Sequence, residues 1–149
     1  MRPKSAHDGA QPSGNATMLE NFARLFVITG NSEWKKRADY LLETYAEPAI
    51  AQFFPHLSLL NACDSLFNAL EISLLQKDIH PLEGAFKAAI HSLSLPTLIL
   101  KYEQQPSLET DHMTLCTQQR CSSPITDPRA ISSFLKAARS GDPIFNSGE

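Results

Sequence analysis

Residues 115–128 read LCTQQRCSSPITDP, which places two cysteines five positions apart, then a polar turn and then Asp127-Pro128. An aspartate can accept hydrogen bonds from the free N–H groups at a helix start, and proline is favoured at the first helical position. Asp127 therefore predicts the start of a last helix. Its apolar positions are Ile131, Phe134, Leu135 and Ala138.

Upstream of this stretch, two short apolar runs flank one helical pattern. The runs are residues 72–75 and 97–102. The pattern between them consists of Leu82, Phe86, Ala89, Ile90 and Leu93. Run, helix and run in this order are typical of a βαβ unit with parallel strands and a right-handed crossover. Residues 112–115 predict a third strand that ends at Cys116.

Further upstream, residues 12–70 carry helical periodicity. A first apolar stripe consists of Leu19, Phe22, Ala23 and Phe26, and a second of Trp34, Ala38, Leu41, Leu42 and Tyr45. Gly30 predicts the end of the first helix, because glycine tolerates the left-handed conformation found there. Asn31 or Ser32 can cap the second helix. The short connection predicts an antiparallel hairpin.

A third helix is predicted after Pro55 and extends to about Leu70. Pro48 and Pro55 are expected to break or restart the helical path, because proline lacks the backbone N–H. The apolar face of this helix is predicted to consist of Leu59, Leu60, Cys63, Phe67 and Leu70.

The sequence thus predicts a mixed α+β fold. A helical hairpin and a third helix are followed by a small βαβ-type sheet and a C-terminal helix. We expect a flexible N-terminus over residues 1–11, a helical segment over 12–70, a small α/β cap over 71–138 and a flexible tail over 139–149.

Composition narrows the classes of partner. Hydrophobic residues make up 42% of the chain and charged residues 19%, as in ordinary globular proteins. A net charge of -3 gives no sign of a positively charged surface that would bind nucleic acid. No apolar run approaches the roughly 20 residues that span a bilayer. Three cysteines, an odd number, fit a reducing compartment, so we expect a cytoplasmic protein without nucleic-acid or membrane partners.

Two motifs together resemble the C-terminal region of the spermatogenesis-associated protein 20 family. The first is residues 8–15, DGAQPSGN, which open a helix. The second is Cys116-x4-Cys121 followed by residues 123–128, SPITDP. The order of elements between them agrees as well, including residues 71–75 as the first strand. The resemblance extends over about residues 8–138.

This resemblance implies a truncated member or C-terminal fragment of a larger protein. The family carries a thioredoxin-like domain and an α/α toroid like that of six-hairpin glycosidases. A thiol-redox or carbohydrate-related role is therefore implied for the complete protein only. The chain departs from the family at residues 114–116, Thr-Leu-Cys in place of Tyr-Val-Cys, and at Gln76-Lys77 in place of a glycine. The second departure weakens the expectation of a functional loop after the first strand.

Cys116 and Cys121 are the redox candidates. The spacing favours two reduced thiols packed at a strand end. A switchable disulfide is the first alternative, and closing so short a loop would contribute about 2 kcal/mol. The least favoured alternative is a metal site formed by both cysteines and His112, because the spacing of these three residues matches no usual zinc pattern. No metal or cofactor is predicted.

Asp8, Ser13 and Asn15 are the ligand candidates at the start of the first helix. In the toroid that the resemblance implies, such loops line the central cleft, where these groups could hydrogen-bond a sugar-like ligand. Helix capping is the favoured interpretation. Glycoside hydrolysis needs two carboxylates that flank one bond, and no such pair can be assigned. We therefore predict no catalytic residue and no turnover by this chain alone.

The alternative function is a self-sufficient helical module for binding or assembly. The fragment interpretation differs from it in one expectation, because helices taken from a toroid should leave an apolar side uncovered. We expect that side around Phe22, Phe26, Leu41 and Tyr45, where it would mediate self-association or contact partner helices.

Overall fold

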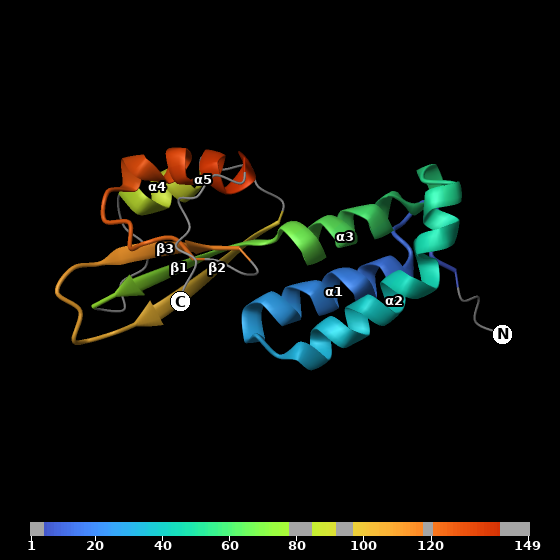
Figure 1. The fold of residues 1–149 in the computed structure, drawn as a ribbon, viewed down its shortest axis with the longest axis horizontal. Helices are drawn as coiled ribbons and strands as arrows, with labels where there is room; N and C mark the ends of the chain where they lie inside the picture. The colour runs from blue at the N-terminus through green and yellow to red at the C-terminus, as the bar shows by residue number, and fades with distance from the viewer. Residues whose placement is uncertain (1–4, 78–84, 92–96, 118–120, 141–149) are drawn as a thin grey trace. The chain divides into compact units, whose positions relative to one another are not determined.

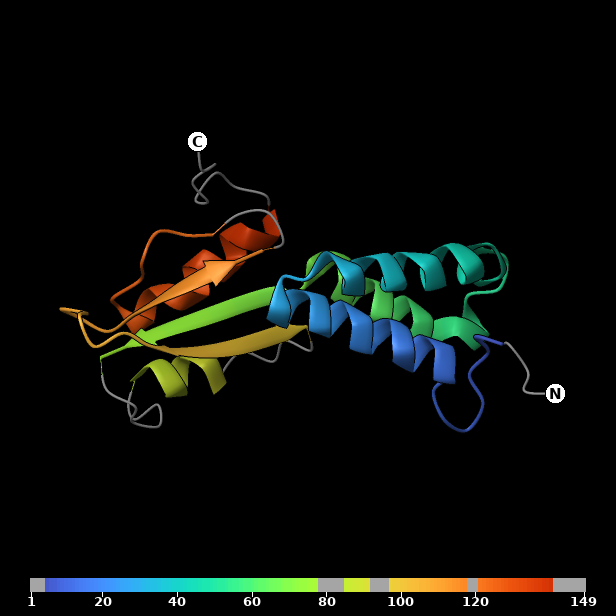
Figure 2. The ribbon, with the colours of Figure 1, turned by 90° about the horizontal axis from the view of Figure 1, so that it is seen from below.

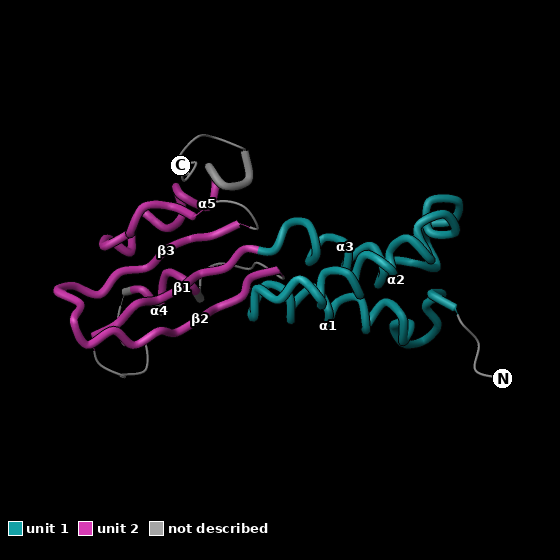
Figure 3. Tube along the Cα trace, turned by 60° about the horizontal axis from the view of Figure 1, so that its bottom comes forward, with its two compact units in different colours: residues 1–69 teal, residues 70–149 magenta. Residues whose placement is uncertain are grey.

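The computed structural model describes residues 5–77, 85–91, 97–117 and 121–140 of the chain. The chain divides into two compact units, residues 1–69 (unit 1) and 70–149 (unit 2), which Figure 3 shows in different colours. Unit 1 is helical, and unit 2 contains a three-stranded sheet with helices. The predicted mixed α+β class is confirmed. Among the described residues, no helix combines the length and the apolar character that a membrane-spanning segment needs.

Over its described residues, unit 1 contains three helices and a short 3-10 turn (Figure 1). They are α1 (Gly14–Thr29), α2 (Ser32–Ala51), η1 (Phe54–His56) and α3 (Leu57–Asn68). Helix α1 packs against both α2 and α3. The core between them is formed by Leu19, Leu59 and Leu66 together with small residues, among them Ala16, Ala23, Ala38 and Ala62.

The predicted helix ends of the hairpin are confirmed. Ser13 Oγ accepts a hydrogen bond from the Ala16 N–H (3.1 Å) at the start of α1. Gly30 ends α1 with a φ of 65°, and its N–H donates to the Phe26 carbonyl (2.8 Å). Asn31 caps α2 by accepting from the Glu33 N–H (3.0 Å).

The prediction of a helix break at Pro48 is wrong. Helix α2 continues through Pro48 to Ala51. Proline removes one N–H, but the Gln52 N–H still donates to the Pro48 carbonyl (3.0 Å), so the last turn closes. Pro55 does precede α3, as the second residue of η1.

The predicted apolar face of α3 is shifted in the structure. Leu59 is buried as predicted, but Leu60 and Phe67 are exposed, and Ala62 and Leu66 are buried in their place. Helix α3 packs against α1, and the small side chain of Ala62 belongs to the core that they share, so the packing of the helices decides which face is buried rather than the size of the apolar residues.

Unit 2 is organised around a central strand, which Figure 2 shows between the two others. Strand β1 (Leu70–Gln76) pairs in parallel with β2 (Leu98–Gln104) and antiparallel with β3 (His112–Cys116). The two predicted parallel strands and the third strand are confirmed. Helix α4 (Ala85–His91) lies between β1 and β2 in the chain. Leu82 and Leu93, predicted for that helix, lie outside the described residues.

One face of the sheet is covered by helices. Alternate residues of the strands bury their side chains against α4 and α5 (Ile131–Ser140), and both helices lie on this face in Figure 1. The buried residues are Leu70, Ile72, Leu74, Met113 and Leu115 from the sheet and Ile90, Ile131 and Leu135 from the helices. Asp127 accepts from the Arg129 N–H (3.0 Å) and caps the 3-10 turn η2 (Pro128–Ala130). Because η2 leads directly into α5, the predicted start of the last helix is confirmed.

Candidate functional site

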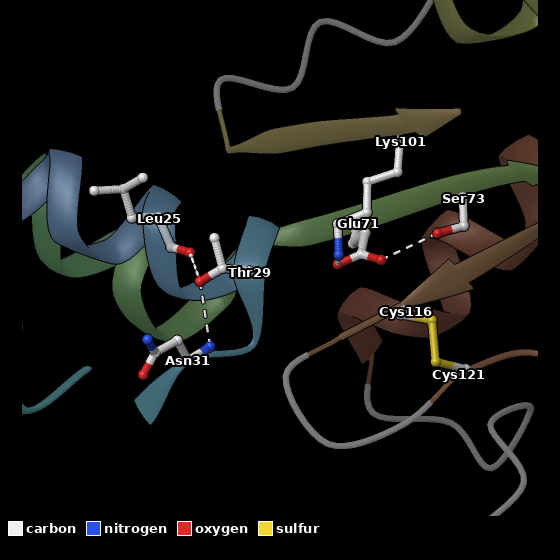
Figure 4. Close-up of polar contacts among 8 residues, drawn as sticks. All are labelled: Leu25, Thr29, Asn31, Glu71, Ser73, Lys101, Cys116 and Cys121. Atoms are coloured by element: carbon white, nitrogen blue, oxygen red, sulfur yellow. Dashed lines mark hydrogen bonds and ion pairs between the residues drawn. A yellow bond between two sulfur atoms is a disulfide. The ribbon is translucent and has the colours of Figure 1, made fainter. Parts of the chain in front are cut away.

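Cys116 and Cys121 form a disulfide in the structure, with 4.0 Å between their Cα atoms (Figure 4). Cys116 is the last residue of β3, and Cys121 lies opposite it in an antiparallel bridge. The disulfide is therefore present in place of the free thiol pair that the sequence favoured. His112 begins β3, about 13 Å along the strand from Cys116, so these three side chains do not converge.

The segment over residues 121–125 lies beside β3 and holds Cys121 in place. The Ser122 N–H donates to the Leu115 carbonyl (2.7 Å), and the Leu115 N–H donates to Ser122 Oγ (3.1 Å). Met113 and Ile125 exchange two further backbone hydrogen bonds (3.0 and 2.8 Å). The disulfide is thus one of several links between this segment and β3. Its reduction should leave the segment attached.

The two cysteines differ in exposure. Cys121 is exposed and Cys116 is half-buried, so an incoming thiol meets Cys121 first. Glu71 faces Cys116 across the β1–β3 pair. Its carboxylate forms an ion pair with Lys101 Nζ (2.7 Å) and accepts a hydrogen bond from Ser73 Oγ (3.0 Å), as Figure 4 shows. The disulfide therefore lies beside a polar cluster in which the negative charge of Glu71 and the positive charge of Lys101 cancel.

The third cysteine belongs to unit 1. Cys63 is half-buried on α3, and burial raises the pKa of its thiol. A raised pKa lowers the thiolate fraction, so the Cys63 thiol is less reactive than an exposed free thiol.

Thiol counting tests the disulfide. Without reductant, the denatured chain should present one reactive thiol, that of Cys63, and three after reduction. Reduction, or the pair Cys116→Ser and Cys121→Ser, should lower the free energy of unfolding by about 2 kcal/mol, because the unfolded chain regains the freedom of the closed loop. Three thiols in the untreated protein would show that the bridge does not form.

Asp8 links three parts of unit 1. Its Oδ1 accepts from the Ser13 N–H (2.9 Å), and its Oδ2 accepts from the Ser58 N–H (2.8 Å) in the first turn of α3. Its own N–H donates to the Pro55 carbonyl (2.7 Å). Together with the burial of Ala6, these contacts hold residues 5–8 against the helices, in a part of the chain that the sequence predicts to be flexible.

The other two ligand candidates have structural partners as well. Ser13 is buried and caps α1, and Asn15 Nδ2 donates to the Ser5 carbonyl and to the Tyr45 hydroxyl (both 2.9 Å). The structure therefore brings Asp8, Ser13 and Asn15 together at one helix start. Their polar atoms form hydrogen bonds within unit 1, which favours helix capping over ligand binding.

The Asp8 carboxylate titrates below its ordinary range. Desolvation on its own would raise the pKa, but the backbone N–H groups of Ser58 and Ser13 together outweigh it and hold the pKa below its ordinary value. A folded-state pKa below the unfolded value means that these bonds stabilise the protein above the unfolded pKa. The stabilisation is lost as the pH falls through the folded-state pKa.

Removing this carboxylate should therefore have a pH-dependent cost. We expect Asp8→Ala to lower the free energy of unfolding by about 2 kcal/mol at pH 7, because two backbone N–H groups lose a charged acceptor. Urea unfolding at pH 7 and pH 2 measures the free energy of unfolding of the variant and of the wild type. The difference between the two proteins should be smaller at pH 2. Asp8→Asn, which keeps one carbonyl acceptor, should cost less. Equal stability of Asp8→Ala and wild type at pH 7 would contradict the linking role.

A further feature of unit 1 is apolar and exposed. Ile50, Phe53, Phe54 and Leu57 lie where α2 gives way to α3, and we refer to them as the 50–57 surface. Ile50 is 82% exposed and Phe54 is 75% exposed. The rings of Phe53 and Phe54 lie 5.6 Å apart between their centroids, and exposed large apolar side chains so close in the sequence are typical of an interaction site.

The sequence predicts an uncovered apolar side at other residues, and that location is wrong. Phe22, Leu41 and Tyr45 are half-buried and pack against the core of unit 1, and Phe26 is half-buried too. The ring of Phe22 also stacks on that of Trp34, with 5.9 Å between the centroids. The sequence signal for the 50–57 surface was Phe53-Phe54 in a short connection between prolines, which offers few neighbours to cover the rings.

Comparison with known proteins confirms the resemblance at the level of the family. No protein-family model matches this chain. Spermatogenesis-associated protein 20 of Homo sapiens is 27% identical to it over 91% of this chain and 20% of that protein. The protein of the same name from Rattus norvegicus is 26% identical over 91% of this chain and 19% of its own length. The chain thus spans about a fifth of the curated relatives that it matches.

Proposed function

From its likeness to one fifth of spermatogenesis-associated protein 20, we propose that this chain is a docking part of a larger assembly. In this proposal the chain has no catalytic turnover alone, and the 50–57 surface packs against apolar helices of a partner. Without that partner, the same surface mediates self-association. The exposure of Ile50 and Phe54 is the observation that carries the proposal.

Unit 1 presents exposed apolar side chains to a partner, rather than the polar groups at the start of α1. The polar atoms of Asp8, Ser13 and Asn15 already have hydrogen-bond partners within the unit. The large side chains of the 50–57 surface, by contrast, remain exposed. The two most exposed, Ile50 and Phe54, would each gain about 1.5 kcal/mol or more on full burial, and the other two less. Packing of apolar side chains into a groove between helices is a common mode of recognition.

Dye binding tests whether this surface is available in the folded chain. We expect an apolar fluorescent dye to bind the wild type, and Phe54→Ser to lower the signal. Ile28→Ser is the matched control, because Ile28 is 50% exposed near the end of α1 remote from residues 50–57 and should change the signal less. Equal signals from the two variants would contradict the proposal.

Thiol exchange at Cys116–Cys121 is a second candidate, supported by the exposure of Cys121. An incoming thiolate attacks the Cys121 sulfur, the S–S bond breaks, and Cys116 leaves as a thiolate that takes up a proton. With glutathione as the thiol, mass spectrometry should locate the mixed disulfide on Cys121 rather than Cys116. A thiol-redox role of this kind would belong to the complete protein. A carbohydrate-related role rests on the resemblance alone.

A further inference from the structure

The two edges of the sheet in unit 2 differ. The outer edge of β3 is paired with residues 121–125. The outer edge of β2 pairs with no strand among the residues that the structure describes. A free strand edge presents unpaired N–H and C=O groups, which are a template for another strand.

The register of β1 and β2 identifies the groups that face outward. The Leu70 N–H donates to the Thr97 carbonyl (3.2 Å), and the Gln105 N–H donates to the Gln76 carbonyl (2.9 Å). Between these two bonds the strands pair continuously in parallel. Because alternate residues bond to the same neighbour in a parallel pair, odd-numbered residues of β2 face β1. The backbone groups of Leu98, Leu100, Tyr102 and Gln104 therefore face outward.

Two charged side chains lie on the sheet face away from α4 and α5. Lys101 forms the ion pair with Glu71 across the β1–β2 pair. Glu103 is exposed and forms no ion pair with the described residues. Tyr102 lies between them in the sequence, pairs with Leu74 of β1, and is 56% exposed.

We propose that the outer edge of β2 pairs antiparallel with β2 of a second copy of this chain, with Tyr102 opposite Tyr102 of that copy. An antiparallel pair of identical strands is two-fold symmetric, so it closes a dimer. In this register Lys101 faces Glu103 of the second copy, and the pair occurs twice. Leu100 and Gln104 then exchange their outward backbone bonds.

Charge selects this register over its neighbours. With Lys101 at the centre, the two lysines would face each other, and directly opposed like charges are destabilising. With Leu100 at the centre, Lys101 would face Ile99 and the charge pairs would be lost. Pro106 sets the end of the pairing, because it would face Leu98 and has no N–H to donate.

Charge reversal tests the register by sedimentation equilibrium of the full chain. Glu103→Lys and Lys101→Glu should each weaken the dimer about tenfold, because each replaces two attractive cross-strand pairs with two repulsive ones. An equal mixture of the two variants should restore dimerisation, since the two lysines of one variant's strand then face the two glutamates of the other's. Glu109→Lys, an exposed reversal beyond the strand, is the control and should leave the dimer unchanged.

The proposal is overturned if Glu103→Lys dimerises as the wild type does, or if the mixture associates no better than its components. It is also overturned if Ile50→Ser with Phe54→Ser abolishes all association while Glu103→Lys changes none. That last result would leave the docking role of the 50–57 surface standing, so the two proposals can fail separately.

Discussion

Replacing Ile50 and Phe54 together with serine should weaken self-association through the 50–57 surface about a hundredfold. Two large apolar side chains that contribute about 1.5 kcal/mol each to an interface account for this size of effect. Both are largely exposed in the folded chain, so the free energy of unfolding should change little. Sedimentation equilibrium measures the association, and urea unfolding checks the fold.

The control for this double variant is Ile28→Ser, which removes an exposed isoleucine from the other end of α1. It should associate as the wild type does. A dimer paired through β2 should survive in the double variant, because that edge belongs to unit 2. Wild-type association by the double variant would show that the 50–57 surface is not the contact.

Ile72→Ala should have the largest effect on stability. Ile72 lies in the middle of the central strand, has no exposed surface, and belongs to the core that α4 and α5 cover. Truncation leaves a cavity that rigid neighbours fill only partly, so we expect a loss of about 3 kcal/mol in the free energy of unfolding. Urea unfolding followed by circular dichroism measures it.

Ile99→Ala is the matched control for this substitution. Ile99 is half-buried on β2 and lies on the opposite face of the sheet. It should cost about 1 kcal/mol, because fewer contacts are lost. Equal costs at the two positions would contradict the assignment of the covered face.

The parts of the fold that sequence could predict depend on local chemistry. Ser13 and Asn31 cap helices with their own side chains, and Gly30 supplies the left-handed residue that ends α1. The apolar runs of β1 and β2 and the aspartate before Pro128 are equally local signals. Such features are determined within a few residues, so their pattern is visible in the chain.

The remaining features depend on contacts between distant residues. The Asp8 carboxylate accepts a bond from Ser58, fifty positions along the chain, and no spacing rule predicts that. The buried face of α3, with Ala62 and Leu66 in place of Leu60 and Phe67, depends on packing against α1. The Cys116–Cys121 bridge needs residues 121–125 to lie beside β3, which the two cysteines alone do not indicate. The exposure of Phe54 likewise depends on how residues distant in the sequence pack around it.

Sedimentation equilibrium of the wild-type chain over a wide concentration range tests the docking role most directly. We predict association beyond the β2-paired dimer, which grows with concentration and which Ile50→Ser with Phe54→Ser weakens about a hundredfold. A wild-type chain that stays monomeric at every concentration, with its 50–57 surface still exposed to an apolar dye, would contradict it.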